Sequence, residues 1–236
     1  MRWSYMALAD AIQTLCEQVL TDLREAHDYY EATKIAWSTV EGAVEKGEHF
    51  TFHNAVTGSV YSETEIVSKV NGYVSRQLAE ATFVSFLSIF ENFIFEFLRL
   101  WLTAYPQILS SKKLDYKIVL EAADIEAITL HVVNKELNEI LYERPAGWFA
   151  YLEEKAKLGY PTSDEIERIS EAKACRDALA HNRGVASKTY LSKAGKLAQF
   201  VDGERVEIIE PYHRAIWDLL CQVVAKISNA AIAKVS

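Results

Sequence analysis

Apolar residues recur at spacings of three, four and seven through the first part of the chain, which is the period of one face of an α-helix. From Ala7 to about Glu45 there is no proline, and Gly42 is the first glycine. The pattern predicts one very long amphipathic helix, or a helical hairpin whose turn the sequence does not mark. Such a stripe packs against a core. Its members are Leu8, Ile12, Leu15, Val19, Leu23, Ala26, Tyr30, Trp37, Val40 and Val44.

A second long helix is predicted from Ser62 to Tyr105. Ser62 and Glu65 have the spacing of a capping box, in which each residue satisfies a backbone N–H of the other at a helix start. Pro106 disfavours helical backbone at the residue before it, so the helix should end there. The second half is aromatic or aliphatic outside one narrow polar strip, which consists of Ser85, Ser88, Asn92, Glu96 and Arg99.

The most apolar part of this helix, residues 83–105, is long enough to raise the question of a membrane span. Charged residues such as Glu91, Glu96 and Arg99 within it would be costly in lipid, so we expect a buried helix and no membrane partner. Glu91 lies off the polar strip among apolar neighbours. It either pairs with Arg176 or is a carboxylate at the rim of the core that reaches solvent, and the sequence leaves both interpretations open.

Residues 46–61, between the two long helices, have turn and strand character and predict a connecting loop. His49 and His53 in this loop would have the spacing of metal ligands only on a helix. No third ligand is evident, so no metal site is predicted.

Shorter elements are predicted after residue 105. Residues 112–122 are ambiguous between strand and helix, residues 124–142 are helical, and Pro145 begins a short helix that runs to Leu158. The next helix begins near Pro161, with Thr162 and Glu165 in the spacing of a second capping box.

This helix should stop at Gly184, because glycine adopts the left-handed conformation that ends many helices. A small hairpin is then predicted around the turn Asp202-Gly203, with residues 200–201 pairing with residues 206–209. Pro211 opens the last helix.

These elements, with four prolines and nine glycines in 236 residues, predict an all-α fold. We expect an up-and-down helical bundle with two long N-terminal helices and a small irregular or hairpin insert before the last helix. Half of the residues are hydrophobic, which is enough for one large core, so we expect a single domain over residues 1–236.

The formal net charge of −8 argues against a general nucleic-acid coat protein, because such binding depends on Lys and Arg. The charge is unevenly distributed. Between Lys173 and Lys196 there are six Lys or Arg against one acidic residue, a net charge of +5 that leaves −13 for the rest. The sequence therefore predicts a basic patch on an acidic body.

Three cysteines without a CxxC pair argue against a disulfide framework or a zinc site and favour the reducing cytoplasm. Residues 1–10 lack the pattern of a signal peptide. There is no Gly-rich phosphate loop, G-x-S-x-G elbow, H-E-x-x-H helix or EF-hand, so the common cofactor and metal classes have no support.

The most unusual residue of the basic patch is Arg176, which falls in the middle of an apolar stripe. A guanidinium keeps its proton, so it must be paired, solvated through a cleft, or reserved for a phosphate or carboxylate. His181 follows five residues later in the last helical turn, and histidine is the residue type that titrates near neutrality. Asp177, four residues before His181, is positioned to orient the imidazole.

RNA carries its own nucleophile, the 2′-hydroxyl. Strand cleavage therefore needs only a base, an acid and positive donors for the developing phosphorane charge, which Arg176 and His181 can supply without a metal. The alternative is structural: His181 is a histidine at a helix end and Arg176 pairs with a carboxylate of the core.

The segment RDALAHNRGV at 176–185 resembles the R-x4-6-H motif of the HEPN superfamily, in which a polar residue commonly follows the arginine. The closest type is RiboL-PSP-HEPN, and the likeness extends to SIFENF at 88–93 and RPAGWFAYL at 144–152. The resemblance implies an all-helical, dimer-forming, metal-independent endoribonuclease that acts as a toxin or antiphage-defence effector. It also implies RNA as substrate, a homodimer, and an antitoxin or defence-system partner.

On this interpretation Arg176 and His181 are catalytic, and no cofactor or metal is expected. The supporting residues are Asp177, Asn182, Arg183 and Glu91, and the substrate-binding residues are Lys173 and Lys188. On an ideal helix Arg176 and His181 point about 140° apart, so two chains meeting at a two-fold axis would combine their residues into one cleft. The alternative function is a catalytically inactive HEPN-like dimerisation or interaction module.

Overall fold

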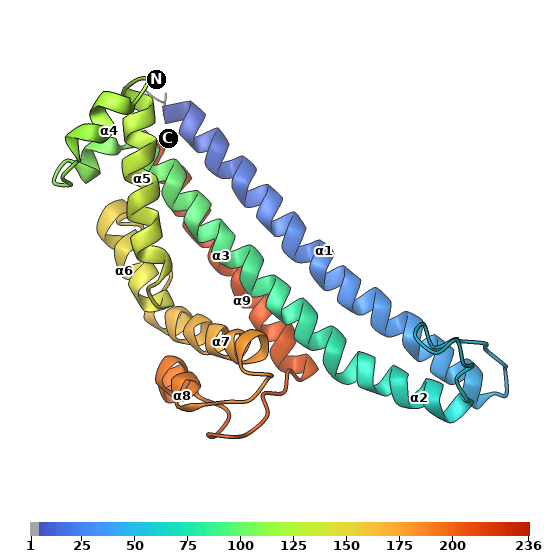
Figure 1. Cartoon of the computed structure of the whole chain (residues 1–236). Helices are drawn as coiled ribbons and strands as arrows, with labels where there is room; N and C mark the ends of the chain where they lie inside the picture. The colour runs from blue at the N-terminus through green and yellow to red at the C-terminus, as the bar shows by residue number, and fades with distance from the viewer. Residues whose placement is uncertain (1–4) are drawn as a thin grey trace.

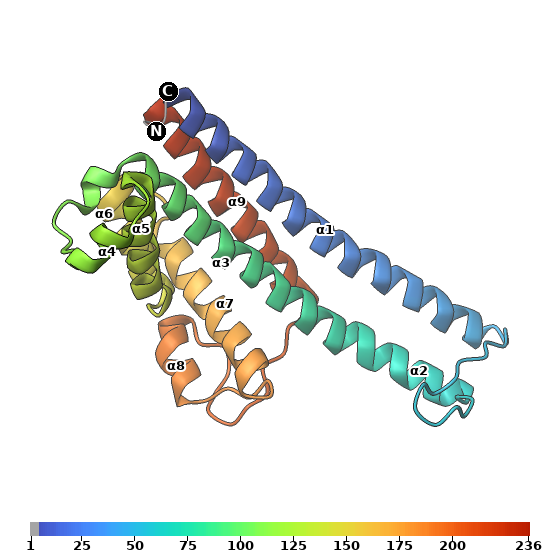
Figure 2. The same cartoon turned by 45° about the horizontal axis from the view of Figure 1, so that its top comes forward.

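The computed structural model describes residues 5–236, with side chains from residue 7 onward. Three long helices lie side by side in it (Figure 1): α1 (Tyr5–Glu45), α3 (Leu78–Ala104) and α9 (Glu210–Val235). α1 runs opposite to α3 and α9, so the first turn of α1 and the last turn of α9 lie at the same end (Figure 2). α1 is one unbroken helix of 41 residues, which decides between the two predicted alternatives. The signal-peptide prediction concerns residues 1–10, of which the first four lie outside the described part.

The second long helix is confirmed in its extent but contains an interruption. It begins with α2 (Glu63–Gly72), where the Ser62 hydroxyl accepts from the Glu65 N–H and the Glu65 carboxylate accepts from the Ser62 N–H, as predicted. It then passes through a π-helical turn, η1 (Tyr73–Gln77), and continues as α3.

The preceding loop, residues 46–61, is irregular as predicted, with one isolated bridge between His53 and Val60. His49 contacts Glu63 instead of His53. A small apolar cluster of its own joins the loop to the ends of α1 and α2, and includes Trp37, Phe52 and Val70.

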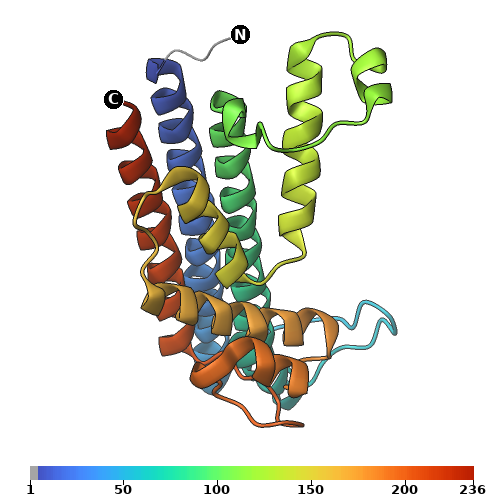
Figure 3. The same cartoon turned by 90° about the vertical axis from the view of Figure 1, so that its left-hand side faces the viewer.

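α3 is the centre of the main core. α1 and α9 pack against one face of it, and α5 (Ile125–Leu141), α6 (Pro145–Ala156) and α7 (Ser163–His181) pack against another, where α7 also crosses and contacts α9 (Figure 3). Its fully buried aromatic residues are Phe83, Phe86, Phe90, Phe93 and Phe97. Burial of this many large side chains is the main stabilising contribution of the bundle.

Two helical stretches, Glu63–Ala104 and α9, are long and apolar enough to cross a membrane by length and composition. About half of each apolar stretch, 50% and 44%, is buried inside the bundle. Core helices of soluble proteins pass the same test, so these stretches are weak support for a membrane role.

The short helices complete the all-α fold, which is confirmed: in residues 5–236, β pairing is limited to isolated bridges. The ambiguous segment 112–122 is helical where it is regular. The short elements are η2 (Pro106–Leu109), α4 (Tyr116–Glu121), α8 (Lys188–Ala194) and η3 (Gly195–Leu197).

The prediction of a hairpin before α9 is wrong about which segments pair with each other. The turn at Asp202-Gly203 is present, but residues 203–206 pair with residues 184–186 through the bonds Ala186 N–H to Glu204 O (2.7 Å) and Val206 N–H to Gly184 O (2.8 Å). Val206 is fully buried, so packing on the core draws this segment inward and against the chain that leaves α7. The segment that follows His181 is held by this pairing.

Candidate functional site

The helix that carries the motif, α7, begins and ends as the sequence predicts. Thr162 and Glu165 form the second capping box, and the helix ends at His181. Arg183 already has a positive φ of 55°, one residue before Gly184 with a φ of 73°. The helix therefore ends in left-handed backbone as predicted, and both Arg183 and Gly184 adopt that conformation.

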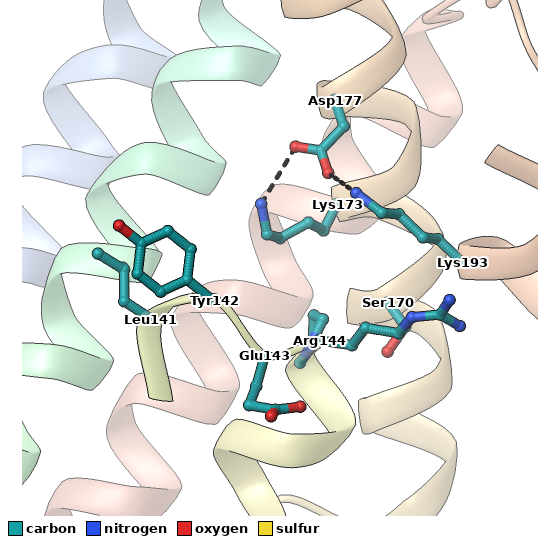
Figure 4. A pocket seen from close by; sticks show the side chains of 9 residues that line it. Leu141, Tyr142, Glu143, Arg144, Ser170, Lys173, Asp177 and Lys193 are labelled. Carbon is teal, nitrogen blue, oxygen red and sulfur yellow. Dashed lines mark hydrogen bonds and ion pairs between the residues drawn. The ribbon is translucent and has the colours of Figure 1, made fainter. Parts of the chain in front are cut away.

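Asp177 is the centre of a cation cluster on α7. Its carboxylate lies 3.1 Å from the ammonium of Lys173, 3.2 Å from the guanidinium of Arg176 and 2.8 Å from the ammonium of Lys193 on α8. Figure 4 shows the two lysine contacts. Burial alone would raise the pKa of the Asp177 carboxyl, but the hydrogen bonds from Lys193 and Lys173 hold it below its usual range.

The expectation that Asp177 orients the imidazole of His181 is therefore wrong. The carboxylate is occupied by the ammonium groups of Lys173 and Lys193, and hydrogen bonds between charged groups are the stronger kind. His181 is exposed in the last turn of α7, and no described residue forms a hydrogen bond with its ring.

Glu91 lies opposite this cluster on α3. Its carboxylate is 3.1 Å from the ammonium of Lys173 and 3.9 Å from the guanidinium of Arg176, so the paired interpretation of Glu91 is correct and Lys173 is the closer partner. The Arg176 side chain is only 20% exposed. Its Nε is buried and forms no hydrogen bond with the described residues. The predicted pair Arg176 and His181 thus differ sharply in their surroundings.

Two adjacent pockets open on either side of Asp177 and Lys193. One of about 240 Å³ lies between α7 and the turn from α5 to α6, and is shown in Figure 4. The other, of about 270 Å³, lies between the end of α7 and α8. Arg176 lines neither of the two pockets.

The first pocket is lined by Leu141, Tyr142, Glu143, Arg144, Pro145, Ser170, Lys173, Asp177 and Lys193, and we call it the Arg144 pocket. The second has His181 and Asn182 on its wall together with Ser187, Thr189 and Tyr190, and we call it the His181 pocket. Asp177 and Lys193 are common to both, so the two pockets form one continuous surface.

Several residues of this surface were not predicted as site residues. The sequence places Lys193 in the basic patch without assigning it a role, and Arg144 enters only through the family resemblance. Arg144 donates to the backbone oxygen of Ser192 at 2.9 Å and to its hydroxyl at 3.2 Å, which joins the start of α6 to α8. The sequence signal for Lys193 was its membership of the +5 segment.

The remaining predicted site residues lie around the His181 pocket. Asn182 uses its side-chain amide to donate to Val185 O at 2.6 Å, so it stabilises the helix end. Arg183 and Lys188 are exposed, and Lys188 is the first residue of α8. Neither lines the two pockets.

A buried polar network beneath the His181 pocket holds α7, α8 and α9 together. The Glu171 carboxylate accepts hydrogen bonds from the Cys175 thiol at 3.1 Å, from the Tyr190 hydroxyl at 3.3 Å and from the Tyr212 hydroxyl. Burial, and after it the charge of Glu171, raises the pKa of the Cys175 thiol far above its usual value. The thiol therefore stays protonated, and this network is structural.

No group of three His, Cys, Asp or Glu side chains suited to a metal occurs in the described part of the chain. Comparisons of the chain with models of protein families, with curated proteins and with solved structures found no match. The helical bundle and the two pockets beside Asp177 are therefore the observations on which a function rests.

Proposed function

We propose that the protein is a metal-independent endoribonuclease of the HEPN type, acting in the cytoplasm as a toxin or antiphage-defence effector. The observation that carries the proposal is the exposed imidazole of His181, which has no hydrogen-bond partner among the described residues and lies on a pocket shared with Lys193. An unpartnered imidazole can take up and release a proton, and a nearby ammonium can bind phosphate.

In the proposed reaction, the 2′-hydroxyl of RNA attacks the adjacent phosphorus while His181 removes its proton. The 5′-oxygen leaves with a proton, and a 2′,3′-cyclic phosphate remains. Positive side chains stabilise the phosphorane, which carries more negative charge than the ground state. Arg176 serves this role once the phosphate competes with Asp177 and Glu91 for its guanidinium.

The proposal includes a homodimer. One imidazole would have to serve both as base and as acid, and Arg176 and His181 project in different directions from α7. A two-fold contact near the ends of the motif helices supplies a second His181 and a second cation cluster to the same cleft. An antitoxin or other defence-system protein that covers this surface would restrain the activity.

A second candidate function, a non-catalytic interaction module, is favoured by the contacts of Arg176. Its ion pairs with Glu91 and Asp177 are those of an arginine that joins α7 to α3. Exposed apolar side chains such as Leu120 and Ile125 offer a surface for a partner.

The test is incubation of the pure protein with mixed RNA in EDTA. We expect cleavage that leaves 2′,3′-cyclic or 3′-phosphate ends, because the 2′-hydroxyl is the nucleophile. His181→Ala should abolish cleavage while the protein stays folded, because the side chain is exposed. His131→Ala removes an exposed histidine of α5 and serves as the matched control.

A requirement for Mg²⁺, or products with 5′-phosphates, would overturn this mechanism. Undiminished cleavage by folded His181→Ala would show that the assigned site is wrong. Absence of cleavage by the parental protein on all RNAs tested would favour the interaction module.

A further inference from the structure

The Arg144 pocket contains a positive charge that no carboxylate neutralises. Arg144 donates only to the backbone oxygen and the hydroxyl of Ser192, and no described carboxylate lies within ion-pair distance of it. By contrast, Lys173 contacts two carboxylates and Lys193 contacts one. A guanidinium oriented by neutral acceptors retains donors for an incoming anion, and its planar fork suits a phosphate.

An exposed aromatic ring, that of Tyr142, lies on the rim of the same pocket. Tyr142 follows the last residue of α5 and is 90% exposed, so neither face of its ring is covered by the core. In Figure 4 its ring stands beside Leu141, across the pocket from Asp177. Exposed aromatic rings next to cations are the usual stacking platforms for the bases of single-stranded nucleic acids.

The size and position of the pocket fit part of a polymer. Its volume of about 240 Å³ is below the roughly 300–1,000 Å³ typical of pockets that enclose a free ligand. It also continues into the His181 pocket across Lys193. A strand whose scissile phosphate lies by His181 would therefore extend over Lys193 toward Arg144.

We propose that the Arg144 pocket is a subsite for a nucleotide flanking the cleavage point of single-stranded RNA: Arg144 and Lys193 bind its phosphate and Tyr142 stacks on its base. This inference rests on the proposed function for the identity of the strand. The pocket lining has three cationic side chains, Arg144, Lys173 and Lys193, against the carboxylates of Glu143 and Asp177, and this net charge of +1 favours an anionic group beside the Tyr142 ring.

The test measures binding separately from cleavage. A fluorescent single-stranded RNA with 2′-O-methyl groups cannot supply the nucleophile, so its affinity is measured by anisotropy at several salt concentrations. Tyr142→Leu should weaken binding about 5- to 150-fold, the range for loss of one stacked base, without changing the salt dependence. Tyr142→Phe should bind like the parental protein, and Tyr116→Leu, on α4, is the matched control for an exposed tyrosine.

Loss of the phosphate contact has a different signature. Arg144→Gln should reduce the slope of log affinity against log salt by about 0.7, which corresponds to about fivefold weaker binding at 0.1 M salt. Arg144→Lys keeps the charge and should retain the parental slope. If the glutamine variant loses the contact with Ser192 and fails to fold, Tyr142→Leu, which leaves that contact in place, decides alone.

Unchanged affinity in both Tyr142→Leu and Arg144→Gln would overturn the subsite, even if His181-dependent cleavage is observed. The expected losses of affinity in a protein that cleaves no RNA would support the subsite and overturn the nuclease instead. Displacement of the strand by adenosine monophosphate at equal concentration would identify a free-nucleotide site and refute the assignment to a strand.

Discussion

Acid should destabilise the bundle through one buried histidine. His213 of α9 is fully buried, and its Nε2 lies 2.8 Å from the hydroxyl oxygen of Thr82 on α3. The Thr82 hydroxyl donates to Leu78 O at 2.8 Å, so its oxygen accepts from the Nε2–H of the histidine. The other nitrogen, Nδ1, is buried without a partner among the described residues. The ring centroid of His27 lies 6.3 Å from the ring centroid of His213. These surroundings therefore favour the neutral form of the His213 ring and oppose its protonation.

Burial, and after it the proximity of His27, lowers the pKa of His213 to about 4. In the unfolded chain the pKa is about 6.5, so protons bind the unfolded state more tightly. The stability contributed by the neutral ring is present above pH 6.5 and is lost as the pH falls toward 4. For this pair of pKa values the loss is about 2 kcal/mol at pH 5, and about 3 kcal/mol below pH 4.

Urea unfolding at pH 7 and pH 5 checks this prediction with His213→Gln. Glutamine retains an N–H for Thr82 and does not titrate in this range, although the loss of ring packing on Tyr30 and Phe86 should destabilise the variant at both values. The fall in unfolding free energy from pH 7 to pH 5 should be about 2 kcal/mol smaller in the variant. His49→Gln, in the exposed loop, should behave like the parental protein. Equal falls in the parental protein and His213→Gln would refute the reasoning.

Two further predictions concern the site. Asp177→Asn should strengthen binding of the 2′-O-methyl RNA about fivefold at 0.1 M salt, because it removes the carboxylate that competes with phosphate for three cations. The same substitution should lower the melting temperature of the protein. Weaker RNA binding would show that Asp177 supports the RNA complex. If the active unit is a dimer, specific activity should collapse on serial dilution over the range where sizing shows dimer giving way to monomer. A folded monomer with constant specific activity would rule out a composite site.

The features that sequence predicted correctly are those encoded by local spacing. The capping boxes at Ser62 and Thr162 depend on residues three positions apart, and both are present. The apolar stripe of α1 predicted its face, and the unbroken helix follows because no proline interrupts it. The π-helical turn at Tyr73–Gln77 has no such marker, and its sequence is compatible with an ordinary helix.

The features that sequence missed depend on residues distant in the chain. The spacing of four residues predicts a contact between Asp177 and His181, but α8 folds back and brings Lys193 to Asp177 from 16 residues away. Arg144 and Ser192 are 48 residues apart, so the wall of the Arg144 pocket has no local pattern. The hairpin prediction failed for the same reason, because residues 203–206 found a partner before α8 instead of within their own turn.

The small apolar cluster around Trp37, Phe52 and Val70 is separate from the main core and lies where α1 ends and α2 begins. It shares α1 with the main core but has its own set of buried contacts, so we expect it to open by local unfolding while α3 and α9 stay packed. His181 and both pockets are built on the main core. The loop at residues 46–61 is therefore the natural position for an inserted label or affinity tag that reports on the protein without disturbing its site.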